Sequence, residues 1–221
     1  RTARADQLAF IQSLRALAPD PAARGLADDA AVLRIGEETL VLTKDMMVEG
    51  VHWLPEQSLA DVAWKLLAVN LSDLAAKGAE PVGVLLGYTI GADDAAFLEG
   101  FEEALRAFDV PLLGGDTVSG EGPRTFSLTA IGRATHLPVA SRRGAQVGDA
   151  VYLCGSAGGA MMGFEALAEG GTADVTPFTR PIALLAEGRA LAPLVTAMMD
   201  VSDGLLLDAW RMAEASRNTL A

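Results

Sequence analysis

The chain has one cysteine and two histidines in 221 residues, and these scarcities exclude whole classes of site. Cys154 has no partner for an internal disulfide, and because it follows "VYL" in an expected strand, we predict a small buried side chain. A lone thiol also fits a reducing compartment, so we expect a cytoplasmic protein. Zinc sites are built mainly from Cys and His, and this chain is a poor candidate for one.

Basic residues are also few, with 17 Lys and Arg against 29 Asp and Glu and a net charge of -12. A chain of this charge repels a phosphate backbone, and no stretch gathers enough Lys and Arg to form a basic groove. No apolar run reaches the roughly 18 residues of a membrane span, and the first residues, "RTARADQ", contain no apolar signal core. We therefore expect neither nucleic acid nor a membrane as a partner.

The familiar phosphate-binding loops are missing as well. The sequence has no "GxxxxGK[ST]" motif, and no "GxGxxG" opens a helix after a strand. The segment "GSAGG" at 155–159 is only a weak glycine-rich signal. If the protein binds a nucleotide, it must do so through another kind of site.

What the sequence does contain is enough apolar material for a substantial core, at 51% hydrophobic residues. Apolar residues recur at helical spacing in three segments, and strand-like runs lie between them. The expected helices cover 5–18, 61–79 and 93–108, and the expected strands lie near 31–35, 39–43, 82–90, 110–113 and 125–133. Strands and helices without strict alternation predict a mixed α/β (α+β) fold.

Polar residues, Pro and Gly become frequent over 135–149, which is typical of a domain boundary or a crossover. We therefore divide the chain into an N-terminal domain, 1–135, and an incomplete C-terminal domain, 136–221. The elements expected in the second part are a strand at 150–155, a helix that ends at Gly170, and helical stretches near 182–192 and 204–216.

Seven aspartates occupy positions where a charge is costly or stands beside a turn: Asp28, Asp29, Asp45, Asp73, Asp116, Asp200 and Asp203. Asp45 is expected to end a strand. Asp73 lies one turn from Asn70 in a very apolar helix, so both side chains need a polar partner. Asp116 follows a strand and two glycines, which let the backbone approach a ligand closely.

Asp200 and Asp203 flank Ser202 just before an amphipathic helix. Capping of that helix by Ser202 or Asp203 is a structural alternative, although it does not explain Asp200. A calcium loop of the EF-hand type is disfavoured, because the regular oxygen ligands and the terminal glutamate are absent.

Carboxylates that converge repel one another, and their burial costs on the order of several kcal/mol each unless a cation compensates. The seven aspartates therefore predict a cation site, and a set of oxygen ligands favours Mg²⁺ or Mn²⁺ over zinc. Because magnesium held by carboxylates is commonly completed by substrate phosphates, phosphoryl transfer is the leading interpretation. Gly114 and Gly115 would supply backbone donors to a phosphate, and Arg142 or Arg143 a guanidinium.

Six segments resemble, in order, the thiamine-monophosphate kinase family, which belongs to the aminoimidazole ribonucleotide synthetase-like superfamily of ATP-binding proteins. They are "DDAAVL", "TKDMMVEGVHWLP", "KLLAVNLSDLAAKGAEP", "LLGGDT", "SRRGAQVGDAVYLCG" and "DVSDGLLLD". The resemblance implies an N-terminal sheet-and-helix domain that pairs into a homodimer, followed by a truncated C-terminal α/β domain.

The resemblance also implies the activity. The γ-phosphoryl group of ATP would pass directly and in line to thiamine monophosphate, giving thiamine diphosphate and ADP in the last step of thiamine diphosphate biosynthesis. No covalent phosphoenzyme and no general base is implied, because the acceptor oxygen is already anionic.

By the family pattern, several Mg²⁺ ions would be held by Asp29, Thr43, Asp45, Asp73, Asp116, Asp200 and Asp203. The positions that match ATP contacts are Gly115, Asp116, Arg142 and Ser202. His52 matches a substrate-contacting histidine, and the further candidates are Asp28 and Lys44.

Three departures from the family pattern stand out. Ala27 replaces a common glycine before the paired acids, and Lys44 stands in "TKD" where a Ser-Thr-Asp triplet is common. Lys44 would either neutralise one carboxylate or contact phosphate. A later acidic, glycine-containing block that helps to bind thiamine in the family has no counterpart in this chain.

Other interpretations stay open at this point. The chain resembles, less closely, other ATP-dependent enzymes of the superfamily, such as aminoimidazole ribonucleotide synthetase or selenophosphate synthetase, although the early catalytic cysteine of the latter is absent. A non-catalytic protein that binds Mg-nucleotide is a third reading. At single positions, His52 would simply pack beside Trp53, and Lys77 is expected to be a solvated helix residue.

Overall fold

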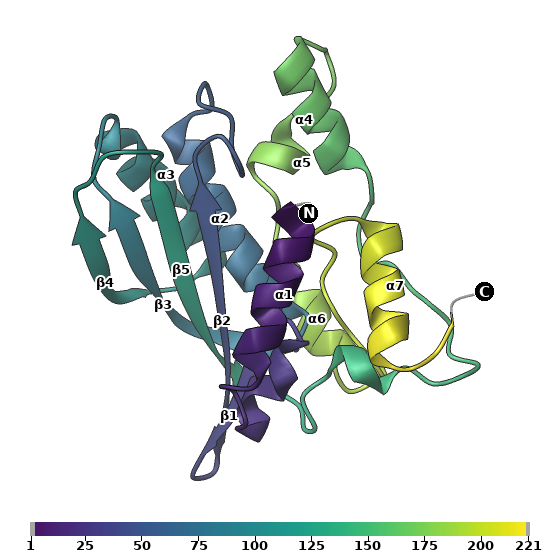
Figure 1. Cartoon of the computed structure of the whole chain (residues 1–221). Helices are drawn as coiled ribbons and strands as arrows, with labels where there is room; N and C mark the ends of the chain where they lie inside the picture. Colours follow the sequence, from purple (N-terminus) through teal and green to yellow (C-terminus); the bar gives the residue numbers. More distant parts are fainter. Residues whose placement is uncertain (1–2, 220–221) are drawn as a thin grey trace.

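The computed structural model describes residues 3–219, and its centre is one five-stranded sheet with the order β1-β2-β5-β3-β4 (Figure 1). The strands are β1 (Ala31–Ile35), β2 (Glu38–Val48), β3 (Ala79–Thr89), β4 (Leu112–Val118) and β5 (Thr125–Ala134). All neighbours are antiparallel except β3 and β4, which are parallel. The mixed α/β class expected from the sequence is confirmed.

The helices are α1 (Ala3–Arg15), α2 (Leu59–Ala75), α3 (Asp94–Phe108), α4 (Gly159–Glu169), α5 (Thr176–Thr179), α6 (Leu185–Leu191) and α7 (Leu205–Ala215), with short 3₁₀ turns η1 (Pro21–Leu26) and η2 (Arg142–Gly144). Figure 1 shows α2 and α3 behind the sheet, α1, α6 and α7 beside it, and α4 and α5 above. None of the described helices is long and apolar enough to cross a bilayer.

Helix α2 organises the core. The Ser58 side chain caps its first turn by accepting the Ala60 N–H, and Gly78 follows its end in a left-handed conformation that suits glycine. Four of its leucines, Leu66, Leu67, Leu71 and Leu74, are fully buried against the sheet and α3. At the other end of the core, the Phe126 ring stacks between two aromatic rings, 5.2 Å from that of Trp53 and 4.8 Å from that of Tyr88.

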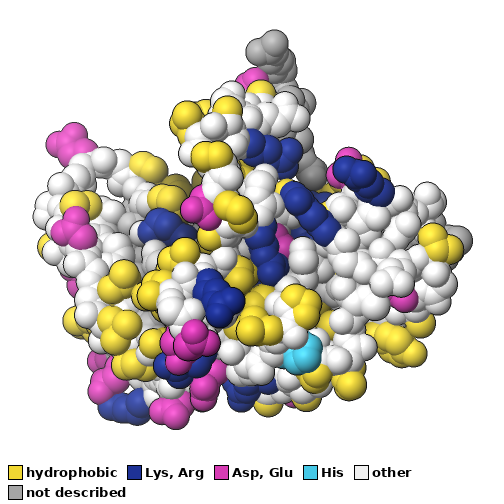
Figure 2. Space-filling view, turned by 90° about the horizontal axis from the view of Figure 1, so that it is seen from below, with side chains coloured by type: hydrophobic (Ala, Val, Ile, Leu, Met, Phe, Trp, Pro, Cys, Tyr) yellow, Lys and Arg dark blue, Asp and Glu magenta, His cyan; other side chains and the backbone are white. Residues whose placement is uncertain are grey.

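The opposite side of the sheet, which we call the outer face, carries Ile35, Lys44, Met46, Leu85 and Asp116. Strand residues alternate between faces, and Thr43 and Met47 are buried on the α2 side, so Lys44 and Met46 point away from it. Met46 is 51% exposed on this face. Figure 2 shows apolar groups exposed among charged ones on another side of the molecule, where they are spread rather than gathered.

Two expected strand ends lie elsewhere. β2 stays paired with β5 as far as Val48, so Asp45 lies inside the strand and does not end it. Asp116 likewise lies inside β4, opposite Gly87 of β3, and does not follow the strand. A partner strand decides where pairing stops, and the single sequence does not reveal that partner.

The strand expected at 150–155 is not formed, and Cys154 is exposed, so both predictions were wrong. A strand needs a hydrogen-bonding neighbour. No described segment pairs with this one, and its apolar residues, including Val151 and Tyr152, remain exposed.

The contact between α2 and α3 gives a test of the fold. A side chain on Gly100 of α3 would collide with the backbone of Ala60 in α2. We expect Gly100→Val to lower the free energy of unfolding by about 1–3 kcal/mol, because the two helices must move apart. Urea unfolding measures this, with Gly120→Val as control, since no atom lies within 4 Å of the added Cβ at that exposed turn. Equal stability of the two variants would contradict the helix contact.

Candidate functional site

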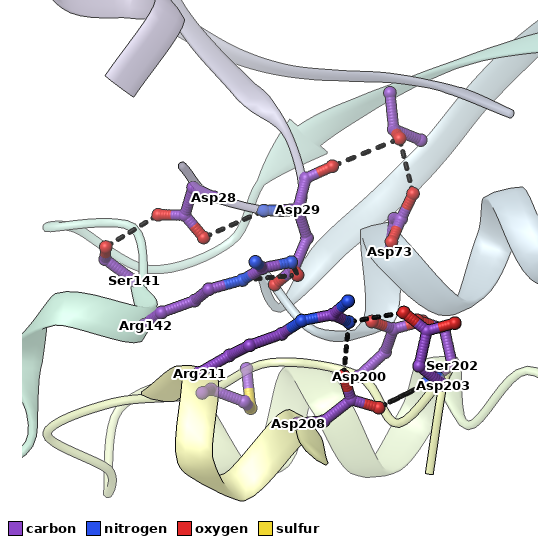
Figure 3. Close-up of polar contacts among 12 residues, drawn as sticks. Asp28, Asp29, Asp73, Ser141, Arg142, Asp200, Ser202, Asp203, Asp208 and Arg211 are labelled. Atoms are coloured by element: carbon purple, nitrogen blue, oxygen red, sulfur yellow. Dashed lines mark hydrogen bonds and ion pairs between the residues drawn. The ribbon is translucent and has the colours of Figure 1, made fainter. Parts of the chain in front are cut away.

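Three carboxylates meet where the sheet, α2 and the segment before α7 come together. Asp29 precedes β1, Asp73 lies in the last turns of α2, and Asp200 lies in the loop before α7 (Figure 3). One oxygen of each lies within 4.8 Å of the others. The structure therefore brings together three of the predicted metal ligands, which are far apart in the sequence. We call these three residues the carboxylate cluster.

Neighbouring polar groups orient the carboxylate cluster. The Thr43 hydroxyl donates to Asp73 Oδ2 and lies 3.2 Å from the Asp29 carbonyl oxygen. Ser72 Oγ donates to Asp200 Oδ2 at 3.2 Å. Because Thr43 comes from β2 and Ser72 from α2, the carboxylates are fixed by separate elements.

Asn70, the polar partner expected beside Asp73, joins α2 to β2. Its Oδ1 accepts the backbone N–H of Asp45 at 3.0 Å, and its Nδ2 donates to the Leu66 carbonyl at 2.8 Å. Asn70 is fully buried and both ends of its amide are satisfied. It sets the position of Asp45 next to the carboxylate cluster.

The carboxylates perturb one another. Burial raises the pKa of Asp73 to about 8, with a further rise from the nearby Asp200 carboxylate. Burial also raises the pKa of Asp200 to about 6, and Asp29 adds to the effect. Burial raises the pKa of Asp45, and the nearby His52 opposes this shift. Negative charge is therefore costly here, and a cation would relieve it.

Two cationic side chains already contact Asp29. Lys77 Nζ lies 2.6 Å from Asp29 Oδ2, and Arg142 Nε donates to Asp29 Oδ1 at 2.9 Å. The ammonium is close enough for an ion pair, but it is not aligned to donate, so the buried Oδ2 accepts no hydrogen bond from any described residue. Lys77 is fully buried, and the expectation of a solvated residue was wrong.

Asp28 has a different environment from Asp29. Its Oδ2 accepts from Arg24 Nη1 at 2.8 Å and from Ser141 Oγ at 2.6 Å, and its Oδ1 accepts from Lys77 at 2.6 Å. These contacts lower the pKa of Asp28 against the effect of burial. Both oxygens are occupied by protein groups, which favours a structural role. The preceding Ala27 has φ -137°, a value open to any residue, so this loop does not need the family's glycine.

The loop before α7 is held from inside the helix by Asp208, a residue that the sequence reading missed. Asp208 Oδ2 accepts three backbone N–H groups, from Ser202 at 3.0 Å, Asp203 at 2.9 Å and Gly204 at 3.1 Å. Arg211 Nη1 lies 2.7 Å from Asp208 Oδ1 and 2.6 Å from Asp203 Oδ2. No side chain caps α7 at its N-cap, Gly204, so the capping alternative for Ser202 and Asp203 is not what is found.

The remaining predicted residues lie farther out. His52 Nδ1 accepts the Val48 N–H at 3.0 Å, which holds the ring at the end of β2. Lys44, next to Asp45 in sequence, lies on the outer face, where its Nζ donates to Ser127 Oγ at 3.2 Å. It therefore does not neutralise the Asp45 carboxylate within this chain.

Gly115 and Asp116 are separated from the carboxylate cluster. Both lie in β4, with β3 and β5 between them and β2. Any side chain at position 115 would overlap the Leu86 carbonyl, which is a packing reason for glycine. The Asp116 carboxylate faces the outer side of the sheet and accepts the Thr117 N–H at 2.9 Å.

The sequence is similar to a described protein family and to proteins of known name. Residues 27–134 match the family model described as AIR synthase related protein, N-terminal domain. Over 208 residues the chain is 43% identical to a thiamine-monophosphate kinase of Caulobacter vibrioides, an overlap that covers 89% of this chain and 59% of that protein. The chain therefore spans about three fifths of that relative's length.

Two solved structures are similar throughout the chain. The thiamine-monophosphate kinase of Stenotrophomonas maltophilia has 35% identity and a TM-score of 0.74, with 94% of this chain and 70% of that one covered. AaThiL complexed with AMPPCP and TMP has 26% identity and a TM-score of 0.88, with 98% and 72% covered.

The raised pKa of Asp73 predicts an unusual pH dependence without metal. A carboxyl whose pKa is raised on folding binds its proton more tightly in the folded state, so stability falls as pH rises from about 4 toward 8. We expect Asp73→Asn to be more stable than the unchanged protein at pH 8.5 in EDTA by at least about 1.4 kcal/mol, the equivalent of one pKa unit, with a smaller gain at pH 5.

Urea unfolding at the two pH values measures this difference. Glu99→Gln, on the exposed side of α3, is the matched control and should show no such dependence. If Asp73→Asn were no more stable at pH 8.5, the cost of ionising Asp73 that we infer from its burial and from the nearby carboxylates would be absent.

Proposed function

This chain belongs to the thiamine-monophosphate kinase family, and we propose that it binds Mg-ATP at the carboxylate cluster and phosphorylates thiamine monophosphate to thiamine diphosphate. The observation that carries the proposal is the convergence of Asp29, Asp73 and Asp200 on one point. The relatives' names support the substrate, and the AMPPCP and TMP in the AaThiL complex support a nucleotide and a phosphorylated acceptor.

The residues present fit a hard divalent cation. The cluster offers only oxygen atoms, the donors that Mg²⁺ prefers, and Asp29 Oδ2 is buried beside the Lys77 ammonium without a directed hydrogen bond. Asp29, Asp73 and Asp200 would hold Mg²⁺, with Thr43 and Asp45 beside them. When bound, Mg²⁺ neutralises charge on the transferring phosphoryl group. We propose several ions, as the resemblance to the family implies.

Arg142 and Ser202 are proposed to contact the ATP phosphates. The Arg142 guanidinium reaches the Asp29 carboxylate, so its donors already lie at the edge of the cluster (Figure 3). Ser202 lies in the loop that Asp208 holds, and its hydroxyl is available while its N–H is occupied. Asp203 is turned toward Arg211 and would join the metal set only by leaving that ion pair.

His52 is proposed to orient the acceptor phosphate, since it lies at the end of the strand that carries Asp45. An anionic oxygen of that phosphate forms a bond to the γ-phosphorus as the bond from this phosphorus to the bridging oxygen breaks, and ADP leaves. No proton has to be removed from the acceptor, so the protein's task is positioning and charge neutralisation.

A homodimer is proposed as well. The outer face is partly apolar and, within the described chain, no helix packs on it as α2 packs on the other side. Asp116 and Lys44 lie on this face. Within one chain these two residues lie away from the carboxylate cluster. A second copy stacked on the outer face would bring them close to residues of the partner chain.

Asp73→Asn gives the test of the metal and nucleotide site. We expect the variant to keep its fold and to lose Mg-dependent binding of AMPPCP by at least about tenfold, because a good charge interaction in such a site is worth at least about 1.4 kcal/mol. Calorimetry with and without Mg²⁺ measures binding, and formation of thiamine diphosphate from thiamine monophosphate and Mg-ATP measures activity.

Two outcomes would decide against the proposal. Unchanged nucleotide affinity in Asp73→Asn would remove the carboxylate cluster from the site. Tight Mg-AMPPCP binding by the unchanged protein, without any thiamine diphosphate formed, would favour a nucleotide-binding protein without kinase activity.

The dimer is tested by charge on the outer face. We expect Met46→Glu to convert a dimer into monomers, because an interface that buries a carboxylate without a partner is strongly disfavoured. Leu98→Glu is the matched control, since Leu98 is exposed on α3 and away from that face. Sedimentation equilibrium measures both, and a Met46→Glu dimer as tight as that of the control would exclude the outer face as the interface.

A further inference from the structure

Lys77 stands out because a lysine is buried completely beside a site that attracts cations. Its side chain has no exposed surface, and neither do the carboxylates that it contacts, apart from a trace on Asp28. Full burial of an ammonium group is costly unless anions pair with it. The burial of Lys77 therefore needs an explanation, whereas a lysine exposed at the surface would need none.

The backbone around Lys77 fixes the position of the ammonium group. The Lys77 N–H donates to the Leu74 carbonyl at 3.1 Å, and Gly78 follows in a left-handed turn. Thr135 Oγ1 donates to the Gly78 carbonyl at 2.6 Å, and any side chain at Gly78 would overlap Ala192. The turn cannot shift easily, so Nζ is held where it is.

Lys77 contacts all three segments that carry the carboxylate cluster. It lies one helical turn beyond Asp73, its Nζ is 2.6 Å from Asp29 Oδ2, and it donates to the Met198 carbonyl at 3.1 Å, two residues before Asp200. Asp28 does not by itself require Lys77, because Arg24 and Ser141 already donate to its other oxygen.

We propose that Lys77 is a built-in cation of the carboxylate cluster: it positions Asp29 and offsets part of the charge that divalent ions would otherwise have to offset. This inference rests on the metal site proposed above. The consequence is a cluster that assembles without metal and binds divalent ions less tightly than its carboxylates alone would. Lys77 is in this sense a positioning residue, since it acts through Asp29.

The repulsion between Lys77 and a bound ion sets the expected effect. An ion on an Asp29 oxygen would lie within a few ångströms of Nζ, and like charges at such a distance repel strongly. We expect Lys77→Met to lower the dissociation constant for Mn²⁺ at least tenfold, measured by electron paramagnetic resonance of free Mn²⁺. In EDTA its melting temperature should be lower than that of the unchanged protein, and saturating Mn²⁺ should recover most of the difference.

A matched charge control is Arg106→Met, because Arg106 is exposed on α3 and its ion pair among the described residues is with Glu102 at the surface. It removes the same charge at a distance from the cluster and should leave the Mn²⁺ affinity unchanged. If Lys77→Met and Arg106→Met had the same Mn²⁺ affinity, or if Lys77→Met bound Mn²⁺ more weakly, the proposal would be overturned.

A second pair of variants covers the case in which Lys77→Met does not fold. Asp28→Asn and the double variant Asp28→Asn/Lys77→Met differ only at position 77. Both lack the Asp28 carboxylate, so the loss of Lys77 in the double variant leaves one buried carboxylate fewer without its partner. We expect the double variant to bind Mn²⁺ at least tenfold more tightly than Asp28→Asn, and equal affinities would overturn the proposal. If the unchanged protein bound no Mn²⁺ at all, the proposed metal site itself would fail, which is a distinct result.

Discussion

The mutual repulsion of buried carboxylates is the constraint on which the rest of this structure depends. Asp29, Asp73 and Asp200 share one point, and burial together with the neighbouring carboxylates raises the pKa values of Asp73 and Asp200. The hydroxyl of Thr43 and the cations of Lys77 and Arg142 are arranged around that point as compensation. Gathering these carboxylates lowers the stability of the folded protein, and nearby positive charge offsets that loss. A destabilising cluster of this kind is therefore a sign of a functional site.

Helix α2 is the element that makes the cluster possible. It carries Asn70 and Asp73 one turn apart among mostly apolar buried residues, and Lys77 follows its last turn. The Asn70 amide couples this helix to Asp45 in β2. Since the packing of α2 decides both the core and the site, changes in the core would reach the cluster directly.

The sequence predicted which residues are candidates for the site better than it predicted where their side chains lie in the fold. Asp73 was found because a carboxylate in an apolar helix is conspicuous, and the mixed fold followed from periodicity. Lys77 and Asp208 were missed because burial of a charged side chain depends on tertiary partners, here Asp28 and Asp29 or the backbone of residues 202–204. Asp116 was grouped with the cluster, but strand order places it across the sheet, and strand order cannot be read from local pattern.

The alternation of β2 has a consequence for how this protein can change. Lys44 and Asp45 are neighbours in the chain, yet Lys44 lies on the outer face and Asp45 points to the opposite side, next to the carboxylate cluster. Inserting or deleting one residue upstream in β2 would exchange the two surfaces and place an ammonium group beside the carboxylate cluster. Substitutions can therefore accumulate on either face of the strand. A change in the length of this segment, however, would disturb both faces together.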